Sequence, residues 1–317
     1  MISLTFLREF IKLYFEFKTQ KRNIKKAFVS IGDKIFTCPL TEILNKNEIK
    51  KIESDALLIQ LGLLQPFAFL TGRKPTPNET LLQVLISICT AIQDNLIDFS
   101  NQEDYNKKIE LLNKLGNYVR ENISHRDLYE MYLYETLKAQ NESKKQFDNE
   151  ISIDKIREIT FKKCGNAFLL IRSILSENLI ENEPEAIFQY GGTAQIGDDI
   201  LDLHDDIAIN LNTLANKTDL KQLIQLFNCE MDKTIILFSK LNYPQKNIRK
   251  AIIRIIIFLS VFNLGLQRYQ KLQINTTDWI AIMKMGRNVL ILDMGKIRFK
   301  FRLIMQTIKY KINILDL

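Results

Sequence analysis

Glycine and proline are scarce in this sequence, with 11 Gly and 6 Pro among 317 residues. An all-β fold needs many tight turns, and therefore many more of both residues. The four cysteines are widely scattered without a CxxC pair, and the chain has only two histidines. These counts disfavour a zinc site and a disulfide framework.

Long uninterrupted apolar runs are also missing. No stretch reaches about 18 uncharged apolar residues, the length expected of a membrane-spanning helix. Charges at Arg8, Glu9 and Lys12 interrupt the first apolar run, so we expect no signal peptide. Together with the scattered cysteines, this predicts a cytoplasmic protein.

Acidic residues are rare at both ends of the chain, although its middle is acidic. The formal charge is +7, and eight Lys and Arg oppose Asp293 alone between residues 284 and 311. Basic ends suit nucleic acid, anionic lipid or a phosphorylated small molecule. No motif of the known RNA-binding folds is visible, so we do not expect nucleic acid as a partner. The ends are either solvated helix faces or a peripheral contact with the inner face of the membrane.

Apolar residues recur at helical spacing along nearly the whole chain, without internal repeats or linkers. We predict an all-α fold, a single domain over residues 1–317 in which about ten helices surround a central apolar cavity. The predicted helices span residues 2–28, 41–60, 78–99, 104–120, 124–140, 151–178, 184–206, 218–241, 245–273 and 277–312. A break is expected near Gly286 or Gly295. Residues 296–303 alternate with a period of two, but without a partner strand we predict a helix there.

A dense acidic cluster follows Gly191, with the carboxylates Asp198, Asp199, Asp202, Asp205 and Asp206. Positions 198, 202 and 205 share one face of the predicted helix. Like charges at this spacing cost stability unless a cation lies among them, and Mg²⁺ prefers oxygen ligands that it shares with phosphates. A solvated acidic face is the alternative, and the apolar neighbours Ile196, Ile200 and Leu201 disfavour it.

Two thinner signals lie upstream. Asp94 and Asp98 stand at i and i+4 with Asn95 between them, at the end of an apolar helix, where they would face the mouth of any cavity. Lys163, in the segment FKKCGNA, could contact a diphosphate oxygen as a point charge. Each has an ordinary alternative, a helix end in solvent or a surface lysine.

These residues resemble the trans-isoprenyl diphosphate synthase and class I terpene synthase superfamily. Residues 94–98, DNLID, match the D(D/N)xxD form of its first motif. The second motif is a Gly, three residues and Q-I-x-D-D-x-x-D, matched by Gly191, Gln195, Ile196, Asp198, Asp199 and Asp202. Lys163-Cys164-Gly165 resembles the K-T-G helix break between the two motifs. The resemblance covers residues 85 to 210.

The resemblance implies Mg²⁺-dependent loss of diphosphate from an allylic isoprenyl diphosphate, followed by cyclisation or elimination in a dry apolar cavity. It also implies three Mg²⁺ ions and a set of site residues. The metal ligands would be Asp94, Asp98, Asp198 and Asp202, with Asp199 as a further candidate. The substrate would contact Lys163, Gln195, Asn95, Thr90, Cys89 and Arg268.

Features of the chain-elongating branch are missing. The nearest candidate for its G-G-K-R-x-R-P segment is residues 71–75, TGRKP, and no Arg pair follows Asp98. We therefore favour a terpene synthase. A prenyltransferase that holds isopentenyl diphosphate through Arg73 and Lys74 stays open, as does a catalytically silent partner subunit.

Two further residue patterns bear on the substrate. Arg268-Tyr269 is similar to the Arg-Tyr pair of terpene cyclases. The small residues Cys89 and Thr90 precede the first motif, where elongases of the resembled family place a bulky residue, and this predicts room for a chain of fifteen carbons or more. The sequence is compatible with a homodimer but leaves the oligomeric state open.

Overall fold

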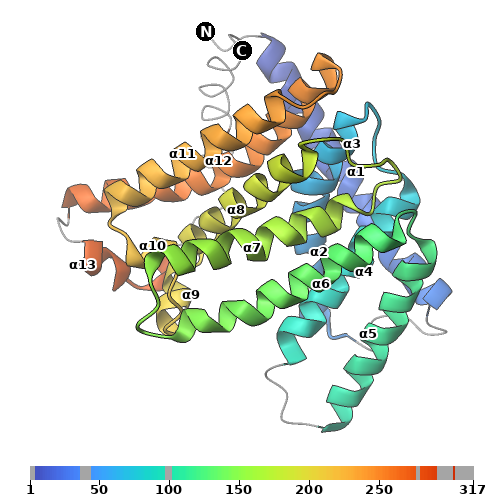
Figure 1. Cartoon of the computed structure of the whole chain (residues 1–317), viewed down its shortest axis with the longest axis horizontal. Coiled ribbons are helices and arrows are strands. Elements are labelled where there is room, and N and C mark those ends of the chain that lie inside the picture. Colours follow the sequence, from blue (N-terminus) through green and yellow to red (C-terminus); the bar gives the residue numbers. More distant parts are fainter. Residues whose placement is uncertain (1–3, 36–43, 97–101, 276–278, 291–302, 304–317) are drawn as a thin grey trace. The chain divides into compact units, whose positions relative to one another are not determined.

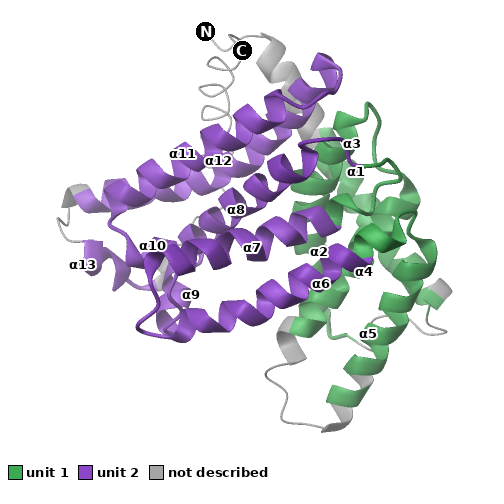
Figure 2. Ribbon diagram, in the orientation of Figure 1, with its two compact units in different colours: residues 1–129, 171–178 green, residues 130–170, 179–317 purple. Residues whose placement is uncertain are grey.

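The computed structural model describes residues 4–35, 44–96, 102–275, 279–290 and 303. All secondary structure in these ranges is helical, which confirms the predicted all-α class (Figure 1). The chain divides into two compact units, residues 1–129 with 171–178 and residues 130–170 with 179–317 (Figure 2). Each unit has its own buried core. The single domain, the central cavity and the isoprenoid-synthase arrangement stay predictions.

Unit 1 is built around one apolar helix, α4, which packs against three other helices. Its elements are α1 (Leu4–Ile35), α2 (Lys46–Ile59), a π-helix (Gln60–Leu64), α3 (Gln65–Leu70), α4 (Pro77–Leu96) and α5 (Gln102–Asn122). The core residues Leu82, Leu85 and Ile88 of α4 are buried because their spacing places them toward α1, α2 and α5.

Local chemistry fixes the helix starts in unit 1. Asn45 caps α2 in a capping box with Glu48, and Thr76 caps α4 in a second one with Glu79. Between α2 and α3 the helix widens into a π-turn because Pro66 has no N–H to donate and its ring crowds the preceding turn. The predicted helix 41–60 therefore begins at residue 46 and continues beyond residue 60.

The boundary between the units falls within two helices, α6 (Arg126–Glu142) and α7 (Ile153–Arg172). A 3₁₀-helix (Ser143–Phe147) lies between the segments predicted as helices 124–140 and 151–178. The other elements of unit 2 are α8 (Glu183–Leu201), α9 (Leu203–Ala208), α10 (Leu214–Lys217), α11 (Leu220–Ser239), α12 (Gln245–Asn275), α13 (Trp279–Met283) and α14 (Arg287–Leu290).

Helix α8 is the centre of unit 2, between α11 and α12. It is buried on most of its faces, as expected for a helix without a wide polar face. Tyr190 packs edge-on against three rings, with centroids 5.0 Å from Phe168 and 6.0 Å from both Phe238 and Phe258. This aromatic cluster fixes α8 and with it the acidic segment at its C-terminal end.

Helix α12 is long and apolar enough, between Gln245 and Gln273, to cross a membrane by length and composition alone. However, 61% of its most apolar stretch is buried inside the structure, as in a core helix of a soluble protein. The predicted cytoplasmic location is therefore compatible with α12 but not established by it.

Several predicted boundaries differ from the structure. The helix predicted over 151–178 ends at Arg172, and the helix predicted over 184–206 divides at Asp202. Of the helix predicted over 277–312, α13 and α14 are described, separated near Gly286 as expected. The ambiguous segment 296–303 lies outside the described residues except for position 303.

Candidate active site

The acidic cluster lies where α8 stops. Asp202 leaves the helix with φ −92° and ψ 7°, and α9 begins at the next residue. The buried hydroxyl of Tyr269, on α12, donates to the carbonyl of Ile200 at 2.7 Å. This carbonyl, close to the end of α8, therefore has a hydrogen-bond partner from another helix. The predicted single helix through all five aspartates is therefore wrong, because the chain turns at Asp202.

The break changes which carboxylates face one another. Asp205, expected on the common face, turns outward, and its carboxylate lies 2.9 Å from Nδ1 of His204. Asp206 takes its place. Burial, together with the charges of Asp199, Asp202 and Asp198, raises the pKa of Asp206 to about 8. The cluster thus consists of Asp198, Asp199, Asp202 and Asp206.

Asp199 is the most enclosed member of the cluster, with 5% of its surface exposed. Its Oδ1 accepts a hydrogen bond from Gln195 Nε2 at 3.0 Å, while its buried Oδ2 has no partner among the described residues. Burial raises the pKa of Asp199 to about 7, and the charges of Asp198 and Asp202 contribute to the rise. A buried carboxylate oxygen without a partner is costly, so a bound cation or a proton on this oxygen would stabilise the site.

Asp198 is more accessible than Asp199. Its side chain is exposed, but the protein around it displaces enough water to raise its pKa. The charge of Lys163 and a hydrogen bond of 3.2 Å from Gln195 Nε2 oppose this rise. Gln195 therefore bridges Asp198 and Asp199 and holds both carboxylates in place.

Lys163 approaches the cluster from α7. Its positive charge lowers the pKa of Asp198, Asp199 and Asp206, yet within the described ranges its ammonium forms no hydrogen bond or ion pair. The adjacent Lys162 differs, because it pairs with Glu158 at 2.7 Å and Glu142 at 3.6 Å. Lys163 is thus a nearby cation that remains available to an added anion.

Glycines bring α7 and α8 together. A Cβ on Gly191 would overlap the backbone of Cys164, one on Gly192 the ring of Phe161, and one on Gly165 the ring of Phe188. Helix α7 continues through Gly165, so the helix break expected at Lys163-Cys164-Gly165 is wrong. These glycines allow α7 and α8 to pack closely, and the close packing places Lys163 near the acidic end of α8.

The donor set suits a hard divalent cation, because all its members are carboxylates or an amide. Within the described ranges, however, no three His, Cys, Asp or Glu side chains are grouped closely enough to hold a metal ion. Magnesium seldom needs such a cage, since it commonly binds one or two carboxylates together with waters and substrate phosphates. The orphaned oxygen of Asp199 and the raised pKa of Asp206 are compatible with such a partial site.

The first aspartate motif lies largely outside the described residues. Asp94 and Asn95 fall in the last turn of α4, and their side chains lie outside the described part of the structure, as does all of Asp98. Of the predicted cavity-lining residues, Cys89 is half-buried and Thr90 donates to the carbonyl of Ile86 at 3.0 Å. These residues belong to unit 1, so their meeting with the α8 cluster stays a prediction.

Arg268 contacts the backbone and not the acidic cluster. Its Nε donates to the carbonyl of Val289 at 2.6 Å, which ties α12 to α14. The next residue, Tyr269, reaches the α8 end and packs against Trp279 with a centroid distance of 5.6 Å. Sequence reasoning missed Asp206 and Tyr269 as site residues. For Tyr269 its place in the Arg-Tyr pair was the available signal.

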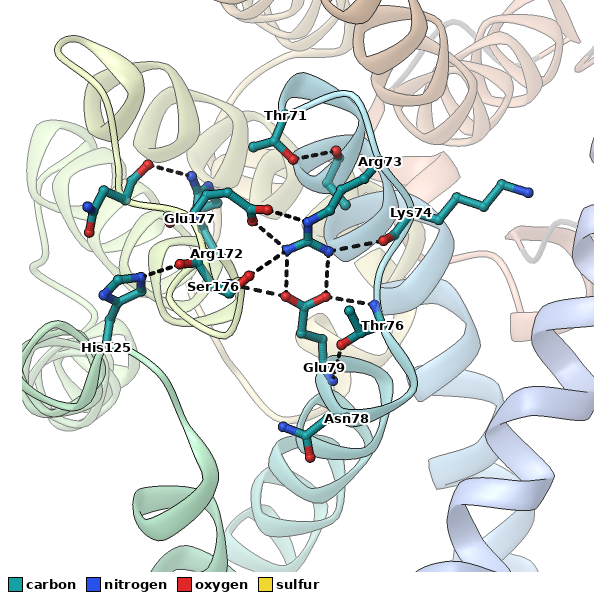
Figure 3. Close-up of polar contacts among 12 residues, drawn as sticks. Thr71, Arg73, Lys74, Thr76, Asn78, Glu79, His125, Arg172, Ser176 and Glu177 are labelled. Atoms are coloured by element: carbon teal, nitrogen blue, oxygen red, sulfur yellow. Dashed lines mark hydrogen bonds and ion pairs between the residues drawn. The ribbon is translucent and has the colours of Figure 1, made fainter.

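Residues 71–75, the candidate segment for binding a second diphosphate, contribute Arg73 to an ion-pair network within unit 1. Arg73 lies between two carboxylates, with both Nη atoms on Glu79 at 2.6 and 2.7 Å and with Nε and Nη2 on Glu177 (Figure 3). These hydrogen bonds raise the pKa of Arg73 and lower that of Glu177. The Lys74 side chain points away from this network (Figure 3).

A separate pocket of about 380 Å³ lies in unit 2 and contains none of the predicted site residues. Its buried carboxylate, Glu230, is already neutralised by Arg157 at 2.5 Å and Lys233 at 3.0 Å, and also accepts from Gln189 at 2.8 Å. The internal pairing leaves this pocket without the unmatched charge that distinguishes the α8 cluster.

No protein-family model, curated protein or solved structure matches this chain. The family therefore stays a resemblance, carried by the motif residues of α7 and α8 and by residues 94–98 of the sequence. The geometry described above is independent of that resemblance.

Proposed function

We propose that the chain is a Mg²⁺-dependent enzyme that removes diphosphate from an allylic isoprenyl diphosphate and directs the resulting cation to cyclisation or elimination. The observation that carries the proposal is the α8 cluster, with four coupled carboxylates, one buried oxygen without a partner, and an available lysine. A site in which four carboxylates outnumber a single lysine suits a ligand that arrives as a metal–diphosphate complex, because the metal ions would meet the carboxylates and the diphosphate would meet the lysine.

Mg²⁺ would be held by Asp198, Asp202 and Asp199, and the resemblance implies that Asp94 and Asp98 are also Mg²⁺ ligands. When bound, it would act as a Lewis acid that stabilises the departing diphosphate. The chain contributes the remaining functions. Lys163 would neutralise a diphosphate oxygen, and Gln195 would hold Asp198 and Asp199 in position. A dry cavity would keep water from the allylic cation.

The engagement of Arg73 argues against the chain-elongating alternative. Two carboxylates surround its guanidinium, so its charge is already more than balanced (Figure 3). A second diphosphate would have to displace Glu79, whose carboxylate is nearly buried and also accepts from the backbone of Thr76 at 2.7 Å. A reaction with one diphosphate substrate is therefore favoured.

The test is a diphosphate-release assay over allylic substrates of increasing chain length, from ten to thirty-five carbons, with and without Mg²⁺ and isopentenyl diphosphate. We expect Mg²⁺-dependent release from at least one substrate alone, and its loss in Asp94→Ala and Asp198→Ala. Product that forms only with isopentenyl diphosphate would identify an elongating prenyltransferase. No release from any substrate would favour the silent partner subunit.

A matched lysine pair separates a site charge from general surface charge. Lys163→Gln should reduce kcat/KM for diphosphate release by about 10–100-fold, because one charge contact to a phosphate contributes roughly 1.5–3 kcal/mol. Lys162→Gln removes the same charge from the adjacent, ion-paired position and should change the rate less than about threefold. Equal effects of the two substitutions would contradict the role of Lys163.

A further inference from the structure

The outward face of α1 carries a compact basic group. Its five exposed members are Lys18, Lys21, Arg22, Lys25 and Lys26. Because each helical residue turns by about 100°, they fall within an arc of about 140°. No acidic residue lies between Glu16 and Asp33, and Glu16 accepts a hydrogen bond from Gln65 at 3.1 Å. The basic group therefore lies on a stretch of α1 that contains no acidic residue of its own.

Two large apolar side chains share this basic arc. Phe15 is 62% exposed and Val29 is 67% exposed, whereas Ile24 and Ile31 on the opposite face are buried in unit 1. Phe15 and Val29 stand fourteen residues apart, about 21 Å along the helix, with the basic group between them. The exposed face thus combines cations with an apolar anchor at each end.

We propose that the face of α1 formed by residues 15–29 binds an anionic lipid surface. The basic side chains would be attracted by acidic headgroups, and Phe15 and Val29 would enter the boundary between headgroups and acyl chains. Nucleic acid offers the same negative charge, but Val29 has no aromatic face on which a base could stack. The lipid surface uses both features of the face. This inference rests on the surface of α1 alone and is independent of the proposed catalytic function.

The test is co-sedimentation of the full-length protein with vesicles of phosphatidylcholine, alone or mixed with phosphatidylglycerol. We expect binding only to the mixed vesicles, weakened by added salt. Lys21→Gln/Lys25→Gln/Lys26→Gln should reduce the partition coefficient about 100-fold, since each basic residue near such a surface contributes roughly fivefold. Phe15→Ser/Val29→Ser, which keeps the charge, should reduce it about tenfold.

The matched control is Lys144→Gln/Lys145→Gln/Lys250→Gln, which removes the same charge from exposed positions outside α1 and should leave binding within about threefold. Equal binding to neutral vesicles, or an equal loss in this control, would overturn the proposal. So would α1-dependent binding to single-stranded RNA without binding to vesicles. Circular dichroism checks that each variant folds. If the triple variant misfolds, the single variants Lys21→Gln and Lys25→Gln replace it, and each should reduce the partition coefficient about fivefold.

Discussion

Substitution of Asp199 by Asn should largely remove an unusual dependence of stability on pH. The folded protein holds the proton of Asp199 more tightly than the unfolded chain, because burial raises its pKa from 3.8 to about 7. For a carboxyl group shifted upward, the stabilisation is complete below the unfolded pKa and is lost as pH rises through the folded value. The free energy of unfolding should therefore decrease between pH 5 and pH 8.

The expected magnitude follows from the same pKa. At about 1.4 kcal/mol for each pH unit between pH 5 and pH 7, the wild-type protein should lose about 3 kcal/mol. Asp206, with a pKa of about 8, adds a smaller part because its side chain is partly solvated. Asp199→Asn cannot ionise, so its stability should decrease by about 3 kcal/mol less over this range.

The measurement is urea denaturation in the absence of added metal, monitored by tryptophan fluorescence. Trp279 is the only tryptophan in the chain and is nearly buried in unit 2, so its emission reports the unit that holds Asp199. Asp205→Asn is the control from the same segment, since its carboxylate is exposed. A wild-type stability that is constant from pH 5 to pH 8, or an Asp199→Asn profile as steep as the wild type, would refute the reasoning.

Three further substitutions test the packing and the ion pairs within the two units. Gly192→Ala should destabilise unit 2 by about 1–3 kcal/mol in urea denaturation, because its Cβ would overlap Phe161, whereas Gly286→Ala, with open space around it, should change stability by less than about 0.5 kcal/mol. Tyr269→Phe should cost about 1–3 kcal/mol by the same measurement, since it removes a buried hydrogen bond, and the exposed Tyr134→Phe should cost nothing measurable. Arg73→Gln should cost about 2 kcal/mol in thermal or urea unfolding, because it removes the partner of the nearly buried Glu79 but acts at a partly exposed pair. It should neither create nor remove a requirement for isopentenyl diphosphate, and a changed requirement would return Arg73 to the substrate site.

The sequence predicted the fold class because helical periodicity is a local property. It also singled out Asp198, Asp199 and Asp202, since the density of carboxylates is visible in nine residues. The turn at Asp202 could not be predicted in this way. It coincides with a hydrogen bond from Tyr269, 69 residues away from Ile200 in the sequence, so Asp206 replaces Asp205 in the cluster.

The surroundings of two residues could not be predicted from the sequence, for the same physical reason. Gly165 was expected to break a helix, but its role depends on the ring of Phe188 on another helix. Arg73 was a candidate for binding a diphosphate, yet Glu177, 104 residues later, occupies its guanidinium. In both cases a distant partner decides the function of the residue, and a single sequence does not reveal that partner.

The glycine contact between α7 and α8 has a consequence for the response of the site to charge. Where two backbones touch, the separation between the helices cannot vary with side-chain rotamers, so the base of Lys163 and the acidic end of α8 keep a fixed spacing. A fixed array of charges needs little reorganisation when a new negative charge develops beside it. Enlarging one of these glycines should therefore raise the reorganisation energy of the site even where the protein still folds.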